Sequence, residues 1–306
     1  MKGAPHWFRR TMRLACPGLV PVLACIATQA YPEVSPPPRM LAPEHWAEHN
    51  VAVGYIGHAS VLIKMGGSLI LTDPTFRDRI GMAVGPLTLG PKRLVKPALP
   101  VDRLPRLSTI LVSHAHFDSL DLPSLLQLSR NATLIAPPEC DDLLGDLGFA
   151  HYIELAWGQH VTVDSVTIEA VPVKHWGNRM PWGKWRGYNA YLLSKDNVHL
   201  LFSPDTAYTP NLARFRTEGP PLSAAILGNG AYDPWIRKHA SPEQVWQMFE
   251  DSGAQHLIPI HWDTFRLGKE PVGDAMRRLV AAAGPDANKI VIREIGGEWL
   301  WQPPAP

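Results

Sequence analysis

The stretch over residues 113–121 constrains this chain more than any other. It follows the apolar run over 109–112 and carries His114, His116 and Asp118 at alternate positions. In a helix, residues i and i+2 lie on opposite sides, so these side chains cannot share one helical face. In an extended segment or a loop at the end of a strand they can converge. Two imidazoles and a carboxylate that converge beside a buried strand are suitable ligands for a divalent metal such as zinc.

Further residues of the same chemical type occur at similar places along the chain. His175, Asp205 and His261 each stand just beyond an apolar, strand-like run. Loops at one edge of a sheet sandwich would bring these side chains close to the first group. The recurrence therefore predicts a metal site that is assembled from separate loops.

The composition of the chain narrows the classes of function. Of its 306 residues, 45% are hydrophobic and 19% are charged, as in an ordinary globular protein with a substantial core. A formal net charge of +1 argues against a surface of basic residues for nucleic acid, so no nucleic-acid partner is expected. Histidine and carboxylate must hold any metal, because the cysteines are too few for a cysteine-rich site. They are Cys16, Cys25 and Cys140.

Residues 1–30 are predicted to be a signal or lipoprotein leader. Basic residues precede an apolar stretch over 14–27, and small residues follow it. The apolar stretch is too short to span a membrane. Residues 22–25 also resemble a bacterial lipoprotein cleavage box, in which Cys25 would be lipidated. We therefore expect the protein to be located in the bacterial cell envelope or periplasm, with peripheral or lipid-anchored membrane association. The alternative is a cytoplasmic protein with an N-terminal arm.

The remaining chain is predicted to form one domain over 44–306, after a Pro-rich linker over 31–43. Strand-like runs over 51–72 with a glycine turn indicate a β-hairpin, and strands alternate with helices farther along, which favours an α/β layered fold. Residues 76–106 are rich in glycine and proline and have no sustained period. This segment is predicted to be a long loop that either covers the site or forms a surface excursion.

The motif over 114–118 resembles the signature of the metallo-β-lactamase fold superfamily. The elements Gly-His-Ala-Ser over 57–60 and Thr-Asp-Pro over 72–74, with Leu-Asp after the motif, are most similar to the branch of N-acylphosphatidylethanolamine-hydrolysing phospholipase D enzymes. The resemblance implies a four-layer αββα sandwich of two mixed β-sheets flanked by helices. It also implies a hydrolase in which a metal activates the attacking water.

The resemblance further implies six ligands for two metal ions. They are three histidines for the first ion, an aspartate and a histidine for the second, and a bridging aspartate, namely His114, His116, His175, Asp118, His261 and Asp205. The bridging aspartate would also orient the attacking water.

Outside this ligand set, the resemblance implies roles for two more residues. Asp73 would be a buried carboxylate that supports the ligand loop. His239 would lie near the substrate head group and hydrogen-bond a phosphate oxygen or assist the leaving group.

One departure from the pattern concerns the second metal. Ser119 stands where the superfamily has its third histidine, and a hydroxyl is a poorer ligand than imidazole. Zinc is the expected cofactor, with a second site that is weak, empty, or filled by manganese or iron. Ser119, Asp121 or water could complete that site, although Asp121 is better explained as a helix cap. His58 is interpreted as a hydrogen-bonded structural residue rather than a ligand.

Three functions fit these features. The first is a metal-dependent phosphodiesterase, phospholipase D-like, which would act on a lipid or small molecule such as an N-acylphosphatidylethanolamine-type lipid. The second is a hydrolase of lactones or other acyl compounds, because the same kind of site attacks carbonyl carbon. The third is an exported metal-binding protein in which Ser119 marks weakened catalysis.

The leader generates the first prediction. If residues 1–30 are removed or lipidated at Cys25, the mass of protein from the native host will differ from that of the full 306-residue chain. Intact-mass spectrometry measures this directly. An unmodified chain that begins at Met1 would contradict the prediction.

Overall fold

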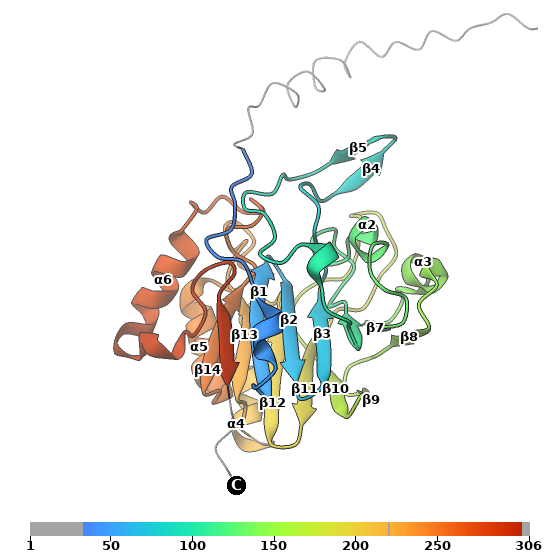
Figure 1. Cartoon of the computed structure of the whole chain (residues 1–306). Coiled ribbons are helices and arrows are strands. Elements are labelled where there is room, and N and C mark those ends of the chain that lie inside the picture. The colour runs from blue at the N-terminus through green and yellow to red at the C-terminus, as the bar shows by residue number, and fades with distance from the viewer. Residues whose placement is uncertain (1–32, 220, 302–306) are drawn as a thin grey trace, which may run out of the picture. The chain divides into compact units, whose positions relative to one another are not determined.

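The computed structural model describes residues 33–219 and 221–301 (Figure 1). The leader predicted over 1–30 lies outside these residues. Within the described part of the chain, none of the helices combines the length and the apolar character that crossing a membrane requires.

Two mixed β-sheets form the centre of the fold. The first has seven strands in the order β15-β1-β2-β3-β6-β7-β8. Its strands are β1 (Val51–Gly57), β2 (Ser60–Met65), β3 (Ser68–Thr72), β6 (Thr109–Leu111), β7 (Thr133–Ala136), β8 (His151–Glu154) and β15 (Glu298–Trp301). The pairs from β15 to β3 are antiparallel, and those from β3 to β8 are parallel.

The second sheet has six strands in the order β14-β13-β12-β11-β10-β9. Its strands are β9 (His160–Val163), β10 (Val166–Val171), β11 (Ala190–Lys195), β12 (Val198–Ser203), β13 (Ala224–Gly228) and β14 (His256–Ile260). The pairs among β12, β13 and β14 are parallel and the others are antiparallel.

Helices flank both sheets. The longest are α5 (Pro242–Ser252) and α6 (Asp274–Ala283), which Figure 1 shows together beside the second sheet. The single-turn helices are α2 (Leu122–Leu125), α3 (Asp141–Leu144) and α4 (Arg214–Thr217). The short 3₁₀ helices are η1 (Pro43–Trp46), η2 (Val101–Arg103), η3 (Gly145–Leu147), η4 (Pro210–Ala213) and η5 (Gly284–Lys289). The predicted α/β sandwich of two mixed sheets with flanking helices is confirmed.

Alternating side chains along β12 explain why this sheet is covered on both faces. Leu200 and Phe202 are fully buried in the core between the two sheets, whereas Leu201 is buried in the core beneath α5 and α6. Because successive strand residues point to opposite faces, a run that is apolar throughout needs a cover on each side. The first sheet covers one face, and α5 with α6 covers the other. Ser241 is the N-cap of α5, and its hydroxyl accepts a hydrogen bond from the Gln244 N–H.

The segment predicted as a Pro-rich linker packs against the domain where the structure describes it. Ser35 pairs with Val95 in an isolated bridge, and Leu41 is 1% exposed. The Leu41 N–H also donates to the Ala98 carbonyl at 2.9 Å. Residues from Ser35 onward are therefore part of the fold, because an apolar side chain and paired backbone anchor them to it.

The glycine- and proline-rich segment over 76–106 contains more regular structure than the sequence indicates. It includes a small hairpin of β4 (Met82–Val84) and β5 (Leu87–Leu89), which projects at the top of Figure 1. The hairpin side chains are mostly exposed, which explains why no hydrophobic period marks them.

The second prediction concerns the close approach of the end of β13 to the loop after β12. A Cβ added at Gly228, at the end of β13, would lie 1.6 Å from the Pro204 carbonyl oxygen. Gly228→Ala should therefore lower the free energy of unfolding by about 1–3 kcal/mol or more through overpacking. Urea denaturation followed by circular dichroism measures the change. Gly67→Ala is the matched control, because an added Cβ there meets nothing within 4 Å; equal stability of the two variants would contradict the prediction.

Candidate metal centre

A first cluster forms where loops after three strands meet. His114 follows β6, His175 follows β10 and Asp205 follows β12. His116 Nδ1 lies 2.8 Å from His114 Nε2 and 3.3 Å from His175 Nε2. Asp205 Oδ2 lies 3.3 Å from His114 Nε2 and 3.5 Å from His175 Nε2. Three ring nitrogens and one carboxylate oxygen thus converge on one point.

This donor set fits a metal ion. A neutral imidazole carries only one N–H, so three facing nitrogens cannot all be paired through one another. A tetrahedral ion with bonds of about 2.0–2.1 Å has donor atoms about 3.3 Å apart, close to the separations in this cluster. The four donor atoms of His114, His116, His175 and Asp205 all lie within 4.8 Å of one another.

Hydrogen bonds behind two of these histidines point their Nε2 atoms into the cluster. Ser113 Oγ donates to Asp73 Oδ2 at 2.5 Å, so it accepts from His114 Nδ1 at 2.8 Å. The second buried oxygen of Asp73 accepts the Ser113 N–H at 2.7 Å, and burial raises the pKa of Asp73 to about 7. His175 Nδ1 donates to the Lys238 carbonyl at 3.1 Å. In both histidines the other nitrogen keeps its lone pair for the cluster.

Two hydrogen bonds also join the loop that carries His175 to the loop that carries Asp205. The Lys174 N–H donates to Thr206 Oγ1 at 3.1 Å, and the Lys174 carbonyl accepts from the Ala207 N–H at 2.9 Å. Because these residues flank His175 and Asp205 in the sequence, the two loops cannot move independently.

A second cluster lies on the other side of Asp205. Asp118 Oδ2 is 3.0 Å from His58 Nε2 and 3.3 Å from His261 Nε2. His261 Nε2 also lies 3.0 Å from Asp205 Oδ1. Asp205 therefore presents Oδ2 to the first cluster and Oδ1 to the second, as a bridging ligand would.

His239 lies beside both clusters. One of its ring nitrogens is within 4.8 Å of the donor atoms of Asp205 and His261. Its ring centroid is 5.1 Å from that of His175 and 5.5 Å from that of His261. Burial lowers the pKa of His239 to about 4, so its ring is neutral near pH 7.

Burial and charge act in opposite directions at this site. Burial lowers the pKa of His116 to about 3. Burial also lowers the pKa of His261, but the carboxylates of Asp205 and Asp118 outweigh it and raise that pKa to about 9. The two buried carboxylates therefore draw positive charge into the site, which a divalent cation can supply.

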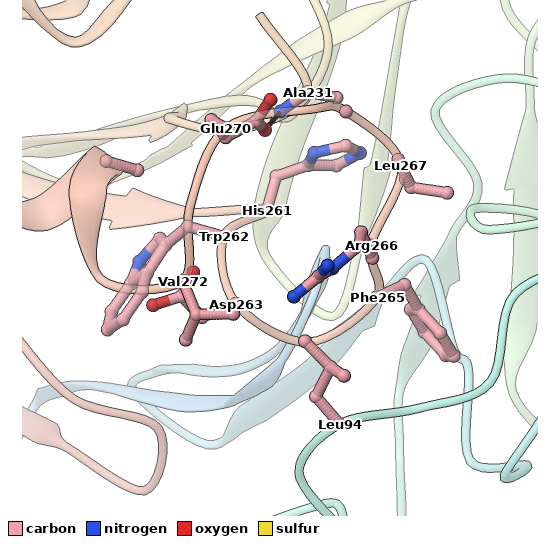
Figure 2. Close-up of a pocket in the computed structure, with 13 residues that line it drawn as sticks. Leu94, Ala231, His261, Trp262, Asp263, Phe265, Arg266, Leu267, Glu270 and Val272 are labelled. Atoms are coloured by element: carbon pink, nitrogen blue, oxygen red, sulfur yellow. Dashed lines mark hydrogen bonds between the residues drawn. The ribbon is translucent and has the colours of Figure 1, made fainter. Parts of the chain in front are cut away.

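A narrow cavity of about 20 Å³ adjoins the second cluster. Figure 2 shows its lining, in which His261, Phe265 and Arg266 come from one loop and Leu94 and Ala231 from two others. A space of this size holds about one water molecule and is too small for a substrate.

The structure places the two other residues considered as ligands as follows. The Asp121 carboxylate binds Arg77 through two hydrogen bonds of 3.1 and 3.0 Å and accepts from Ser124 Oγ at 2.6 Å. Asp121 occupies the N-cap position of α2 without a side-chain cap hydrogen bond, and its bonds to Arg77 and Ser124 direct the carboxylate away from the cluster. Ser119 is fully buried, and in the described part of the chain its hydroxyl has no hydrogen-bond partner.

His58 was interpreted from the sequence as a hydrogen-bonded structural residue, and it does hydrogen-bond Asp118, but its ring also lies within a group of possible metal ligands. It lies in the turn between β1 and β2, and its pKa is lowered to about 4 by burial and by His261. The sequence did contain a pattern that could have identified His58 as a candidate ligand, because it also follows directly after an apolar strand. The sequence could not show that its ring faces Asp118, which is 60 residues away.

Comparisons with known proteins agree with this geometry. A family model described as the β-lactamase superfamily domain matches residues 69–262. An uncharacterized protein of Mycobacterium tuberculosis is 31% identical over 244 residues, which cover 77% of this chain and 65% of that protein. The mitochondrial N-acyl-phosphatidylethanolamine-hydrolyzing phospholipase D of Saccharomyces cerevisiae is 31% identical over 229 residues, which cover 71% of this chain and 48% of that protein. The chain therefore spans less than two thirds of the length of each relative.

A solved structure shows the same fold. The metallo hydrolase Igni18 of Ignicoccus hospitalis superposes with a TM-score of 0.61 at 17% identity, covering 82% of this chain and 98% of that one.

The hydrogen bonds behind His114 generate the third prediction. Ser113→Ala removes the hydroxyl that links Asp73 to His114. Loss of such a support typically lowers metal affinity about 10–100-fold. Competition with a chromophoric zinc chelator measures the affinity. Ser203→Ala is the control, because the buried Ser203 hydroxyl has no partner among the described residues; an equal effect of both substitutions would contradict the prediction.

Proposed function

Because this chain belongs to the metallo-β-lactamase superfamily of metal-dependent hydrolases, we propose that it hydrolyses a phosphodiester in the manner of a phospholipase D. The observation that carries the proposal is the division of the Asp205 carboxylate between two clusters of donors. Sites that hold two cations side by side suit phosphoryl chemistry, because both the attacking and the leaving oxygen need charge compensation. The similarity to the yeast phospholipase D supports the same substrate class.

The residues of the site fit zinc or a similar ion. His114, His116 and His175 would hold one ion, and Asp118 and His261 a second, with Asp205 between them. Ions held there supply electrostatic stabilisation of anionic oxygens and lower the pKa of bound water from 15.7 towards about 7.

The protein itself orients the reactants. The Asp205 carboxylate is fixed between the clusters, where an oxygen can accept a hydrogen bond from the attacking water and hold it in line with phosphorus. His239 is neutral near pH 7 and faces the same space, so its ring N–H can donate to a phosphoryl oxygen or to the leaving group.

A lipid is the substrate that the surroundings support best. The loop after His175 carries Trp176, whose ring packs 4.4 Å from that of His116 and 4.3 Å from that of His175. Farther along this loop, Trp182 and Trp185 are 79% and 59% exposed. Exposed aromatic side chains on the loop that follows a ligand can contact acyl chains while the head group enters the site.

Substrate assays test the proposal directly. Purified protein loaded with zinc, manganese or iron should hydrolyse bis(p-nitrophenyl) phosphate and N-acylphosphatidylethanolamine, and chelation should abolish both activities. Hydrolysis of a lactone or a β-lactam without any phosphodiester activity would overturn the substrate class. Binding of no metal at all would overturn the function.

The fourth prediction concerns the first metal. His175→Ala reduces three imidazole ligands to two. Loss of a residue that only supports a ligand lowers metal affinity up to about 100-fold, so loss of a ligand should lower it further, and activity should fall with it. Elemental analysis after dialysis measures the metal. The control is His160→Ala on β9, an exposed histidine away from the cluster. Full metal occupancy in His175→Ala would exclude His175 from the site.

The fifth prediction separates His239 from the ligands. Because His239 acts on the substrate in this proposal, His239→Ala should keep its metal and lose about 10²–10⁴-fold in kcat. Elemental analysis and steady-state kinetics on the same preparation measure both quantities. If the variant loses metal in parallel with activity, His239 is a ligand instead.

A further inference from the structure

We propose that His58 binds the second metal ion and replaces the imidazole that the motif lacks at Ser119. The proposal rests on the metal-dependent function above and identifies a ligand that the motif does not contain. The second site would then have the two imidazoles of His58 and His261 and the carboxylate of Asp118, with Asp205 Oδ1 beside His261 Nε2 at 3.0 Å. Three such ligands are the number that a catalytic zinc site has, with water in the fourth position, so the second site would be strong rather than weak or empty.

The position of the His58 ring carries the inference. Its Nε2 lies 3.0 Å from Asp118 Oδ2, the same oxygen that His261 Nε2 approaches at 3.3 Å. The ring centroids of His58 and His261 are 4.0 Å apart. The donor atoms of His58, Asp118 and His261 all lie within 4.8 Å of one another, and each residue is at most 8% exposed.

His58 also shares its unusual features with His261. Both have a left-handed backbone, with φ of 57° and 65°. Both bury Nδ1 without a hydrogen-bond partner among the described residues and direct Nε2 at Asp118. A buried histidine that only stabilised the fold would have no need of a rarely adopted backbone.

The backbone around His58 fixes this orientation. The His58 N–H donates to Thr264 Oγ1 at 2.7 Å, and the His58 carbonyl accepts from the His261 N–H at 2.8 Å. The turn after β1 is therefore attached to the loop after β14. Both imidazoles are held against Asp118 by the same pair of segments.

The other candidates for the vacant position are less suitable. The Asp121 carboxylate is bound by Arg77 and Ser124. The Ser119 hydroxyl is a poor ligand for zinc. His239 groups with Asp205 and His261 but not with Asp118, so His58 is the imidazole that faces the centre of the second cluster.

Metal stoichiometry at controlled free zinc tests the proposal. The full chain and its variants are dialysed against zinc buffers and their metal content is measured by mass spectrometry. Wild type and His239→Ala should bind two zinc ions per chain. His58→Ala and His58→Gln should keep the first ion and bind the second at least about 100-fold more weakly. This loss exceeds the one expected for a residue that only hydrogen-bonds a ligand.

The glutamine variant separates a ligand from a residue that only positions Asp118. Its side-chain amide can still donate a hydrogen bond to Asp118 but is a poor zinc ligand. Two tightly bound ions in His58→Gln would therefore overturn the proposal, even if His58→Ala failed to fold. Cobalt spectra give a second readout, because only the absorption of the second equivalent should change in this variant.

A double variant tests the replacement itself. In His58→Ala/Ser119→His, the new imidazole should restore the second ion that His58→Ala loses. A wild type that binds one ion, with His58 variants that also bind one, would reject His58 as a ligand while leaving a one-metal hydrolase intact. A wild type that binds no metal would instead reject the function from which the inference starts.

Discussion

The Asp205 carboxylate joins the two halves of the site, because Oδ2 lies 3.3 Å from His114 Nε2 and Oδ1 lies 3.0 Å from His261 Nε2. A displacement of this one side chain would remove a donor from both clusters at once. Its loop is accordingly held from two directions. On one side, the end of β13 packs closely against the Pro204 carbonyl, because Gly228 has no side chain. On the other side, Thr206 Oγ1 accepts a hydrogen bond from the Lys174 N–H. The rigidity of the sheet edge is therefore part of the chemistry of the site.

The positions that could be predicted from the sequence are those fixed by local pattern. His114, His175, Asp205 and His261 each follow an apolar strand, and strands of one sandwich end at shared edges. The alternation of buried side chains on both faces of a strand such as β12 likewise predicts a covered sheet. Such inferences need only the order of residues along the chain.

The features that sequence reasoning missed depend on partners far away in the chain. Asp121 is bound by Arg77, 44 residues earlier, which removes it from the list of available ligands. His58 meets Asp118 across 60 residues. Leu41, in the segment interpreted as a linker, is buried in the main core. No periodicity or spacing encodes such pairings, because they arise only when separate loops and strands pack together.

A metal ion selects donor atoms by their positions in space and not by their order in a motif. The absence of histidine at position 119 is therefore not by itself a loss of the second site, provided that another imidazole reaches Asp118. His58 does so at a cost to stability, because its left-handed backbone is unfavourable by about 1–3 kcal/mol. Strain of this kind persists only when the surrounding structure imposes it, and here Thr264 and His261 impose it by hydrogen bonds to the His58 backbone. In the proposed second site, the bond between a metal ion and His58 Nε2 would compensate for this strain.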